Sequence, residues 1–132
     1  MSNDVNPFIL LARVTVKPGK REAYLAIAAD VDQAVKTSEP GMLFHNFDQD
    51  PDDDHRFVWT ELYRNSDDFL FHVDNPPVVE YVGLHAELSD AFSLEIYGNV
   101  SAAVLQKIEA LDIPLKHFKT SSVGYVRAER FN

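Results

Sequence analysis

The 132-residue sequence contains no cysteine. Disulfide bonds, thiolate nucleophiles and cysteine-ligated metal ions are therefore excluded. The five histidines follow none of the spacings typical of metal ligands, so we expect no metal site. Basic residues are also few, because 12 Lys and Arg stand against 21 Asp and Glu and leave a net charge of −9. Such an acidic chain lacks the basic surface that nucleic acid requires, and we expect no nucleic-acid partner.

Long hydrophobic runs are absent as well. The apolar stretch in residues 7–14 is too short to span a membrane, and the N-terminal residues lack the basic segment of a signal peptide. We therefore expect a cytoplasmic protein with no membrane association. A hydrophobic content of 45% in a chain of this length is sufficient for one folded core.

Apolar residues repeat with strand or helix period along most of the chain. They predict strands over residues 8–16, 42–48, 57–63 and 91–97, an amphipathic helix over residues 20–37, and a broken helix between the third and fourth strands. Ser66 is the expected N-cap of the first half of the broken helix, and Asn75 that of the second half. The order of elements is the split βαβ arrangement of an α+β, ferredoxin-like fold.

Residues 48–54 (DQDPDDD) form an acidic segment between two of the predicted strands. An EF-hand calcium loop needs glycine at its sixth position and glutamate at its twelfth, and these places hold Asp53 and Trp59. A solvated hairpin connection is therefore the favoured interpretation.

Residues 100–132 lie outside the split βαβ order and differ in charge. They carry 5 basic and 3 acidic residues, whereas residues 1–99 carry 7 and 18. Apolar spacing predicts a helix over residues 104–111, followed by short extended pieces at 113–118 and 122–127. We expect one domain of residues 1–99 and a C-terminal appendage of residues 100–132, which packs on the same domain or on a partner subunit.

Five short motifs occur in a specific order and spacing. They are Glu39-Pro40-Gly41, Gln49-Asp50-Pro51, Arg56-Phe57, Glu61-Leu62-Tyr63, and Phe71-His72 followed by Asn75-Pro76. Together they resemble the antibiotic biosynthesis monooxygenase family over residues 9–98. The resemblance implies a homodimer, a dimeric α+β barrel in which each subunit keeps a pocket between its sheet and helices. The sequence pattern supports this dimer in part. The strand at 57–63 has bulky side chains on both faces, and the predicted helices suffice to cover only one face of the sheet.

The family includes cofactor-free oxygenases that convert phenolic polycyclic compounds to quinones, haem-degrading enzymes, and an isomerase of phosphorylated compounds. The pocket residues of the haem-degrading members are not found in this chain. Their pocket asparagine, tryptophan and histidine fall on Ala12, His72 and Val82. The resemblance therefore implies a protein without a cofactor.

His72 matches the helix histidine that is common in the family outside the haem branch, and it is the candidate catalytic residue. Trp59 and Tyr63 share a strand face and would stack on an aromatic substrate, while Tyr81 or His45 would hold a carbonyl oxygen. The alternative for His72 is a neutral core histidine bonded to a carbonyl group, and the alternative for the aromatic pair is core filling. His45 faces either the pocket or the dimer interface.

The leading functional interpretation is a cofactor-independent monooxygenase that oxidises a phenol or hydroquinone with O2. A base would remove the phenolic proton, so that the electron-rich anion reduces O2 inside a dry pocket. One alternative is an isomerase of a small carbonyl compound, whose phosphorylated form would need a cation such as Arg13, Arg56 or Arg64. The other is a non-catalytic dimeric protein that binds a small ligand.

Overall fold

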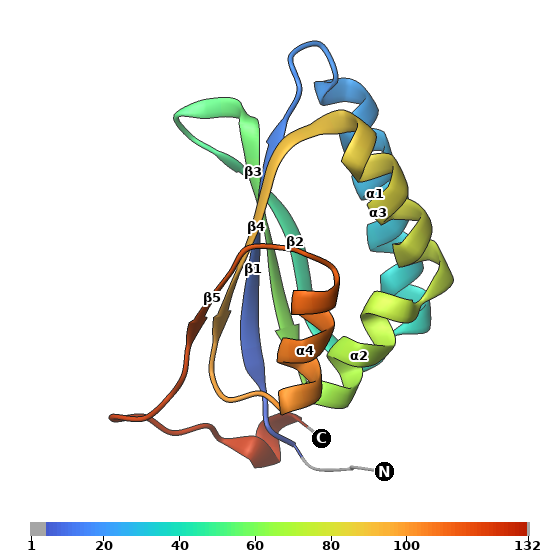
Figure 1. Ribbon diagram of the computed structural model, residues 1–132. Coiled ribbons are helices and arrows are strands. Elements are labelled where there is room, and N and C mark those ends of the chain that lie inside the picture. The colour runs from blue at the N-terminus through green and yellow to red at the C-terminus, as the bar shows by residue number, and fades with distance from the viewer. Residues whose placement is uncertain (1–4, 132) are drawn as a thin grey trace.

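The computed structural model describes residues 5–131, which form one five-stranded sheet and the helices that cover it. The strands are β1 (Phe8–Val16), β2 (Met42–Asp50), β3 (Asp53–Tyr63), β4 (Ser89–Tyr97) and β5 (Leu115–Phe118). The helices are α1 (Arg21–Ser38), α2 (Ser66–Asp74), α3 (Pro76–Leu88) and α4 (Ala102–Ala110), and the short 3-10 helix η1 spans Ala128–Phe131. The α-helices all lie on the same face of the sheet (Figure 1).

The strand order is β2-β3-β1-β4-β5, with β1 in the middle. β1 pairs antiparallel with both β3 and β4, and β2 pairs antiparallel with β3. This is the split βαβ topology, so the predicted α+β, ferredoxin-like fold is confirmed. β5 extends the sheet by pairing parallel with β4, with Leu115 opposite Leu94 and Phe118 opposite Tyr97.

The core lies between the inner face of the sheet and the helices. Alternate residues of β1 point into it, and they are all at most 3% exposed: Phe8, Leu10, Ala12, Val14 and Val16. α1 contributes the buried side chains Tyr24, Ala28, Val31 and Val35 from its apolar stripe. Within residues 5–131, no helix combines the length and apolar character needed to cross a membrane.

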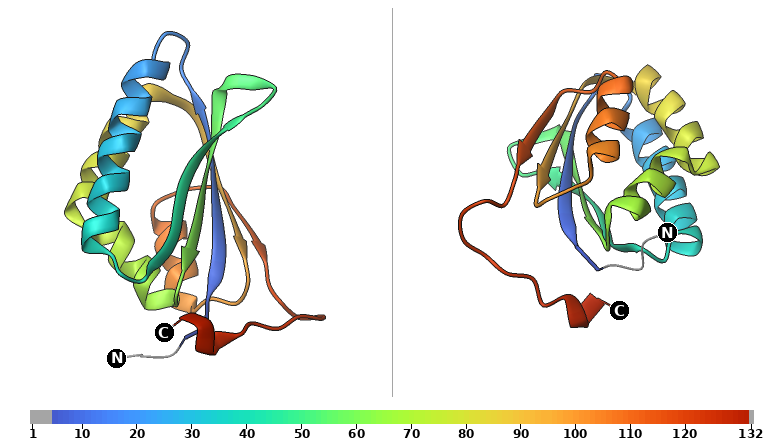
Figure 2. Two further views of the ribbon diagram at one scale, coloured as in Figure 1. Left: turned by 180° about the vertical axis from the view of Figure 1, so that it is seen from behind. Right: turned by 60° about the horizontal axis from the view of Figure 1, so that its bottom comes forward.

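No helix of residues 5–131 lies over the outer face of the sheet, and Figure 2 shows this face from two further directions. Several large apolar side chains on this side are exposed: Ile9 (43%) on β1, Phe44 (45%) on β2 and Tyr97 (37%) on β4. The expectation that both faces are covered is therefore met on one face by this chain's own helices. For the other face, coverage by a second molecule stays a prediction.

The helix starts differ from the expectation at two positions. Asn65, not Ser66, is the N-cap of α2, since its side chain accepts a hydrogen bond from the backbone N–H of Asp68 at 3.0 Å. The Ser66 hydroxyl accepts from the backbone N–H of Ser101 instead, which links the start of α4 to α2. Asn75 does occupy the N-cap position of α3, but its side chain makes no capping bond because its amide is used elsewhere.

The register of β2 also departs from simple alternation. Strict alternation over the predicted strand 42–48 predicts that Leu43 shares a face with His45 and Phe47. An irregularity between Met42 and Phe44 interrupts the pairing with β3, so Leu43 does not lie on that face. Leu43 is 38% exposed. After the irregularity His45 and Phe47 lie opposite Glu61 and Trp59, whose side chains point to the core.

The C-terminal segment divides into two parts of different character. α4 packs into the core through Val104 and Ile108, which are at most 1% exposed, and β5 joins the sheet. The extended piece expected at 122–127 forms no strand, and Val123 and Tyr125 are 95% and 80% exposed. Figure 2 shows this segment leaving the sheet before η1. Whether it packs on a partner subunit stays a prediction.

Candidate functional site

A cavity of about 260 Å³ lies between the inner face of the sheet and the helices. Its walls are mostly hydrocarbon, with contributions from every layer: Leu10 and Leu94 from the sheet, Val78 and Val82 from α3, and Ile108 from α4. A few side chains with polar atoms also reach it: His45, Trp59, Glu61, His72 and Tyr81. An apolar cavity with a few convergent polar groups is the usual form of a small-molecule site.

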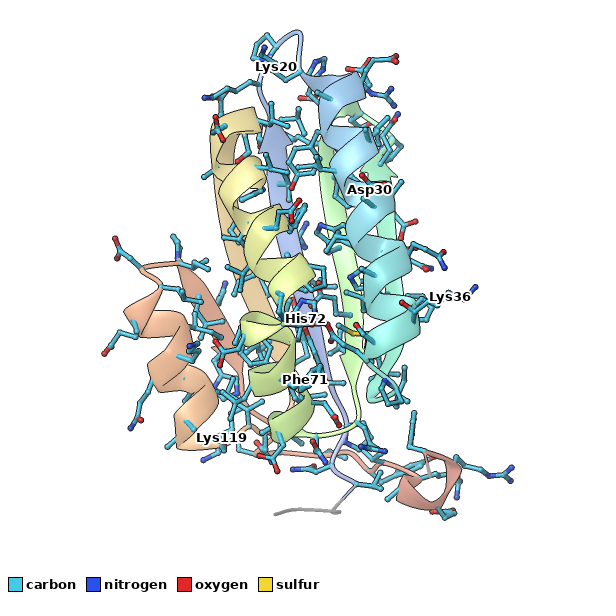
Figure 3. All side chains as sticks on the ribbon, turned by 90° about the vertical axis from the view of Figure 1, so that its right-hand side faces the viewer. Lys20, Asp30, Lys36, Phe71, His72 and Lys119 are labelled. Atoms are coloured by element: carbon cyan, nitrogen blue, oxygen red, sulfur yellow. The ribbon has the colours of Figure 1, made fainter. Side chains whose placement is uncertain are left out.

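His72 lies in the last turn of α2, and its side chain is buried against the C-terminal end of α1 (Figure 3). Its Nδ1 lies 2.9 Å and 3.0 Å from the two carboxylate oxygens of Glu39. The amide of Asn75 donates to the same carboxylate at 2.8 Å and to the Ser38 hydroxyl at 3.0 Å. This is why the Asn75 side chain does not cap α3. Because Nδ1 is used by Glu39, Nε2 is the ring nitrogen left for a ligand in the cavity.

The Glu39-Pro40-Gly41 motif has a physical explanation in this arrangement. Glu39 is the C-cap of α1, and its side chain is 3% exposed. A Cβ atom at Gly41 would lie 2.1 Å from the Asp68 carboxylate, so a larger residue here would displace that side chain of α2. Glycine thus allows the Asp68 carboxylate to pack against the turn that follows Glu39.

The carboxylate neighbours change the acidity of His72. Burial by itself lowers the pKa of a histidine, since it disfavours the charged form. The hydrogen bond with Glu39 and the negative charges of Glu61 and Glu39 act in the opposite direction, and the pKa of His72 is raised above its ordinary value. The partner of His72 is therefore a carboxylate, and not the carbonyl group of the alternative interpretation.

A second polar group surrounds Glu61 on β3. The Tyr63 hydroxyl donates to Glu61 Oε1 at 2.5 Å, and His45 Nε2 lies 3.8 Å from Glu61 Oε2. On its other side, His45 Nδ1 lies 2.8 Å from Asp32 Oδ1, a carboxylate that is 45% exposed. The His45 ring stacks on Trp59 with centroids 4.4 Å apart. His45 therefore faces the cavity, which answers the question that its sequence position left open.

A series of hydrogen bonds links four aromatic side chains beside the cavity. The Trp59 indole N–H donates to the Tyr81 hydroxyl at 2.9 Å, and the Tyr81 hydroxyl is hydrogen-bonded to that of Tyr24. Tyr24 Oη also lies 2.6 Å from His85 Nδ1. Burial is the main cause that raises the pKa of Tyr81 to about 12 and lowers the pKa of His85 to about 4. Both side chains are thus neutral at pH 7.

The structure brings four of the five candidate residues to the cavity wall: His45, Trp59, His72 and Tyr81. Tyr63 is different, because it is fully buried, stacks on Phe8 and does not line the cavity. Its hydroxyl orients Glu61 instead of contacting a ligand. Burial, followed by the charge of Glu61, raises the pKa of Tyr63 well above its ordinary value.

Three side chains that make hydrogen bonds in the candidate site were not predicted as site residues: Tyr24, Glu39 and Glu61. A signal existed for Glu61, since strand alternation places it on the same face as Trp59 and Tyr63, and a carboxylate on a buried face is unusual. Tyr24 belongs to the apolar stripe of α1 and resembles any core residue in sequence. Glu39 belongs to one of the family motifs, but nothing in the sequence showed its contact with His72, because the two residues are 33 positions apart.

The arginines that a phosphorylated substrate would need do not reach the cavity. Arg13 pairs with Glu95 at 3.1 Å, Arg56 with Asp53 at 3.5 Å, and Arg64 with Asp68 at 3.3 Å. No lysine or arginine of the described residues lines the cavity wall. The site as built offers no cation for a phosphate group.

The positions that correspond to the haem branch do lie at this cavity. Ala12, His72 and Val82 all line it, but two of these side chains have no ligating or hydrogen-bonding atom. The residues therefore do not fit a haem group. Among residues 5–131, the grouping that could hold a metal ion is Asp53, Asp54 and His55, which lies in the β2–β3 hairpin and not at the cavity.

Comparison with known proteins identifies the family and supports the fold. The sequence model described as antibiotic biosynthesis monooxygenase matches residues 7–84. A Caulobacter crescentus structure whose name places it among these monooxygenases superposes with a TM-score of 0.69 at 19% identity, covering 74% of this chain and 92% of that one. A similarly named structure from Nitrosomonas europaea gives 0.65 at 22% identity, covering 77% and 98%. Identities at this level show a shared fold.

A curated relative, an uncharacterised protein of Synechocystis, is 29% identical over 77 residues. The match covers 58% of this chain and 52% of the relative, so the chain matches about half of the relative's length. The family match spans more than half of the 132 residues and includes Glu39, Glu61 and His72. The chain therefore belongs to the antibiotic biosynthesis monooxygenase family.

Proposed function

We propose that this protein is a cofactor-independent monooxygenase that oxidises a phenolic or hydroquinone-type small molecule with O2. The observation that carries the proposal is the Glu39–His72 pair, which places a titratable imidazole on the wall of an apolar cavity. Catalytic bases are commonly recognised by a perturbed pKa and a specific charged partner in such a cavity.

In this proposal His72 acts as the general base. Above its folded-state pKa the imidazole is neutral, and Nε2 accepts the phenolic proton of the substrate. Glu39, held by Asn75, orients the ring through Nδ1 and stabilises the imidazolium that forms, as the acid of a catalytic triad does. A base with a raised pKa is also a stronger proton acceptor.

The remaining chemistry belongs to the substrate and O2. The phenolate carbon donates electrons to O2, and a carbon–oxygen bond forms to give a hydroperoxide. The peroxide-bearing carbon then loses its hydrogen as a proton while the oxygen–oxygen bond breaks. One oxygen atom remains as a new quinone carbonyl, and the other leaves as hydroxide, which combines with that proton to give water. The hydrocarbon walls of the cavity exclude bulk water from the reactive intermediate.

The other polar side chains would position the aromatic ring. Trp59 and His45, stacked on one another, offer a flat surface to the substrate. Tyr81 is held by Trp59 and Tyr24, and its neutral hydroxyl would contact a substrate oxygen. Tyr63 supports this arrangement through Glu61 and not through direct stacking.

Of the alternatives, an isomerase of a phosphorylated compound has the least support, because Arg13, Arg56 and Arg64 are paired outside the cavity. A non-catalytic binding protein would need only the cavity, and it is an outcome of the test. The test measures O2 uptake by the purified protein with a panel of hydroxylated aromatic compounds, in air and under anaerobic conditions. Turnover that requires O2 is expected, and equal turnover without O2 rules the proposal out.

Two histidine variants make the test specific. His72→Asn removes Nε2 but keeps an amide donor close to the position of Nδ1, so the Glu39 contact can persist. Turnover should fall by a factor of about 100 or more, the usual contribution of a general base. His55→Gln is the matched control, because His55 lies in the β2–β3 hairpin and contacts Asp54. It should leave turnover unchanged.

A further inference from the structure

We propose that residues 119–131, which we call the arm, dock on a second copy of this chain. The docking site is a groove between helix α1 and the edge strand β2 of that copy, where the arm adds to the edge of the sheet. This contact is independent of the proposed function and of any substrate.

The arm carries apolar side chains that have no partner in their own subunit. Val123, Tyr125 and Val126 are 95%, 80% and 53% exposed, and Figure 2 shows the arm leaving the sheet after β5. From Ser121 to Val126 the backbone makes no hydrogen bond with any other described residue. Residues 122–127, where the sequence predicts an extended piece, therefore lack the neighbouring strand that such a piece needs. Extended segments of this kind bind by adding a strand to an exposed sheet edge.

The groove offers such an edge. It has a volume of about 410 Å³ and is lined by apolar groups of both elements, among them Leu25 and Ala28 of α1 and Phe47 of β2. β2 is the first strand in the order β2-β3-β1-β4-β5, so no strand of the described residues pairs with its outer edge. An unpaired edge is a template for another chain. The carboxylates of Asp32 and Asp48 also line the groove.

The charges of the arm and the groove are opposite. Three of the arm's residues are basic and one is acidic. Its basic side chains form no ion pair among residues 5–131: Lys119, Arg127 and Arg130. In the groove, Asp48 likewise has no hydrogen bond or ion pair with a described residue, and the Asp32 side chain is 45% exposed. Opposite potentials steer association and fix which surfaces meet.

A two-fold dimer brings the arm to this groove. The arm follows β5, which forms the opposite edge of the sheet from β2. When two open faces meet around a two-fold axis that runs along the strands, β5 of each subunit lies over β2 of its partner. The 13 residues 119–131 reach up to about 40 Å when extended. This length is sufficient to pass the β2 edge and enter the groove.

The docked arm would also lie next to the candidate site. His45 and Trp59 line both the cavity and the groove, so these two side chains form the wall between them. Each subunit would thus cover the outer side of its partner's cavity wall.

A cross-linking test is direct because the chain has no cysteine of its own. Ala29→Cys, at an exposed position that lines the groove, is combined in turn with Ser122→Cys, Val123→Cys or Val126→Cys. The full-length double variants are oxidised at micromolar concentration and separated by mass without reductant. At least one should form a disulfide-linked dimer, since a disulfide forms when the Cα atoms come within about 4.4–6.8 Å. Ala23→Cys, exposed on α1 outside the groove, is the matched control and should not cross-link.

Three results would overturn the proposal. A disulfide within one chain would show that the arm packs on its own subunit. No disulfide at any of the three arm positions would show that the arm does not reach the groove. Equal cross-linking to Ala23→Cys would show that the contact is not specific.

Charge reversal provides a second measurement, by sedimentation at low salt. Arg127→Glu together with Arg130→Glu should weaken the dimer at least about tenfold, because like charges then meet in the groove. Adding Asp48→Lys should recover much of the affinity, whereas a loss without recovery would place the arm elsewhere and overturn the proposal. Lys20→Glu reverses an exposed charge before α1 and should leave the dimer unchanged. A reversed arm that dimerises as tightly as the wild type would also overturn the proposal.

Discussion

At the scale of single residues, the pairing of Glu39 with His72 decides how His72 should be tested. Sequence reasoning suggests that His72→Phe costs little, provided the imidazole makes no buried hydrogen bond. The structure shows such a bond, to a carboxylate whose side chain is 3% exposed. Phenylalanine would leave Glu39 with Asn75 as its remaining side-chain donor.

The first prediction compares two replacements of His72. His72→Phe should lower the free energy of unfolding by about 3 kcal/mol, because removing one partner of a buried ionic pair leaves the other poorly solvated. His72→Asn should lower the free energy of unfolding by clearly less, since the asparagine amide can still donate to Glu39. Both variants should lose activity to the same extent. Denaturant unfolding measures both. Equal stability of wild type and His72→Phe would show that the Glu39 contact contributes nothing to folding.

The second prediction concerns pH. Because the pKa of His72 is raised, its base form appears only as pH rises through a value above the ordinary one of about 6.5. The rate at limiting substrate should therefore increase with pH through that region. Glu39→Gln removes a cause of the shift and should move the midpoint to lower pH. A profile of kcat/KM against pH for both proteins tests this. An unchanged midpoint would show that Glu39 does not raise the pKa of His72.

At the scale of elements, the α4–β5 unit is part of the core although it lies outside the family match. Val104 and Ile108 are buried, and Ile108, Leu111 and Ile113 line the cavity. The segment after β5 differs, because its apolar residues such as Val123 are exposed. The two parts should respond differently to truncation.

The third prediction follows from this difference. A chain ending at Asn99 loses the burial of two core side chains, roughly 3–6 kcal/mol, and should melt roughly 10 °C lower or aggregate. A chain ending at Lys119 retains α4 and β5 and should melt close to the full-length protein. Thermal unfolding and solubility measure both. If the chain ending at Asn99 is as soluble and heat-stable as the full-length protein, the prediction that α4 stabilises the core is wrong.

At the scale of the whole molecule, the sheet has one face that no helix of residues 5–131 covers. Ile9, Phe44 and Tyr97 are each more than a third exposed on the side that no helix covers. Contiguous apolar surface of this kind usually marks an interface. A second copy of the same face would cover it, as the family resemblance implies.

The fourth prediction is a homodimer through this face. Sedimentation should give twice the 14.9 kDa mass of the chain at micromolar concentration. Phe44→Asp should weaken the dimer by about 100-fold or more, since it buries a charge at the interface. Phe71→Asp is the control, because Phe71 is 55% exposed on α2, on the helical side (Figure 3). A stable wild-type monomer would contradict the prediction.

The order of elements could be predicted from the sequence because strand and helix periods are local properties. His72 was a candidate because of the family resemblance and Trp59 because of strand alternation, and both line the cavity. The cap of α2 and the face of Leu43 were predicted wrongly. Asn65 and Ser66 are both good caps, and the irregularity in β2 depends on its pairing with β3.

The sequence by itself determined the fold class, the acidic character and the family, since each depends on composition or on motifs at short range. Only the tertiary structure decided which groups meet. Glu39 and His72 are 33 residues apart, and Tyr24 and Tyr81 are 57 apart. Contacts at such separation are set by how α1, α2 and α3 pack on the sheet. The acidity of His72 depends on those contacts, because burial and neighbouring charge are properties of the folded chain.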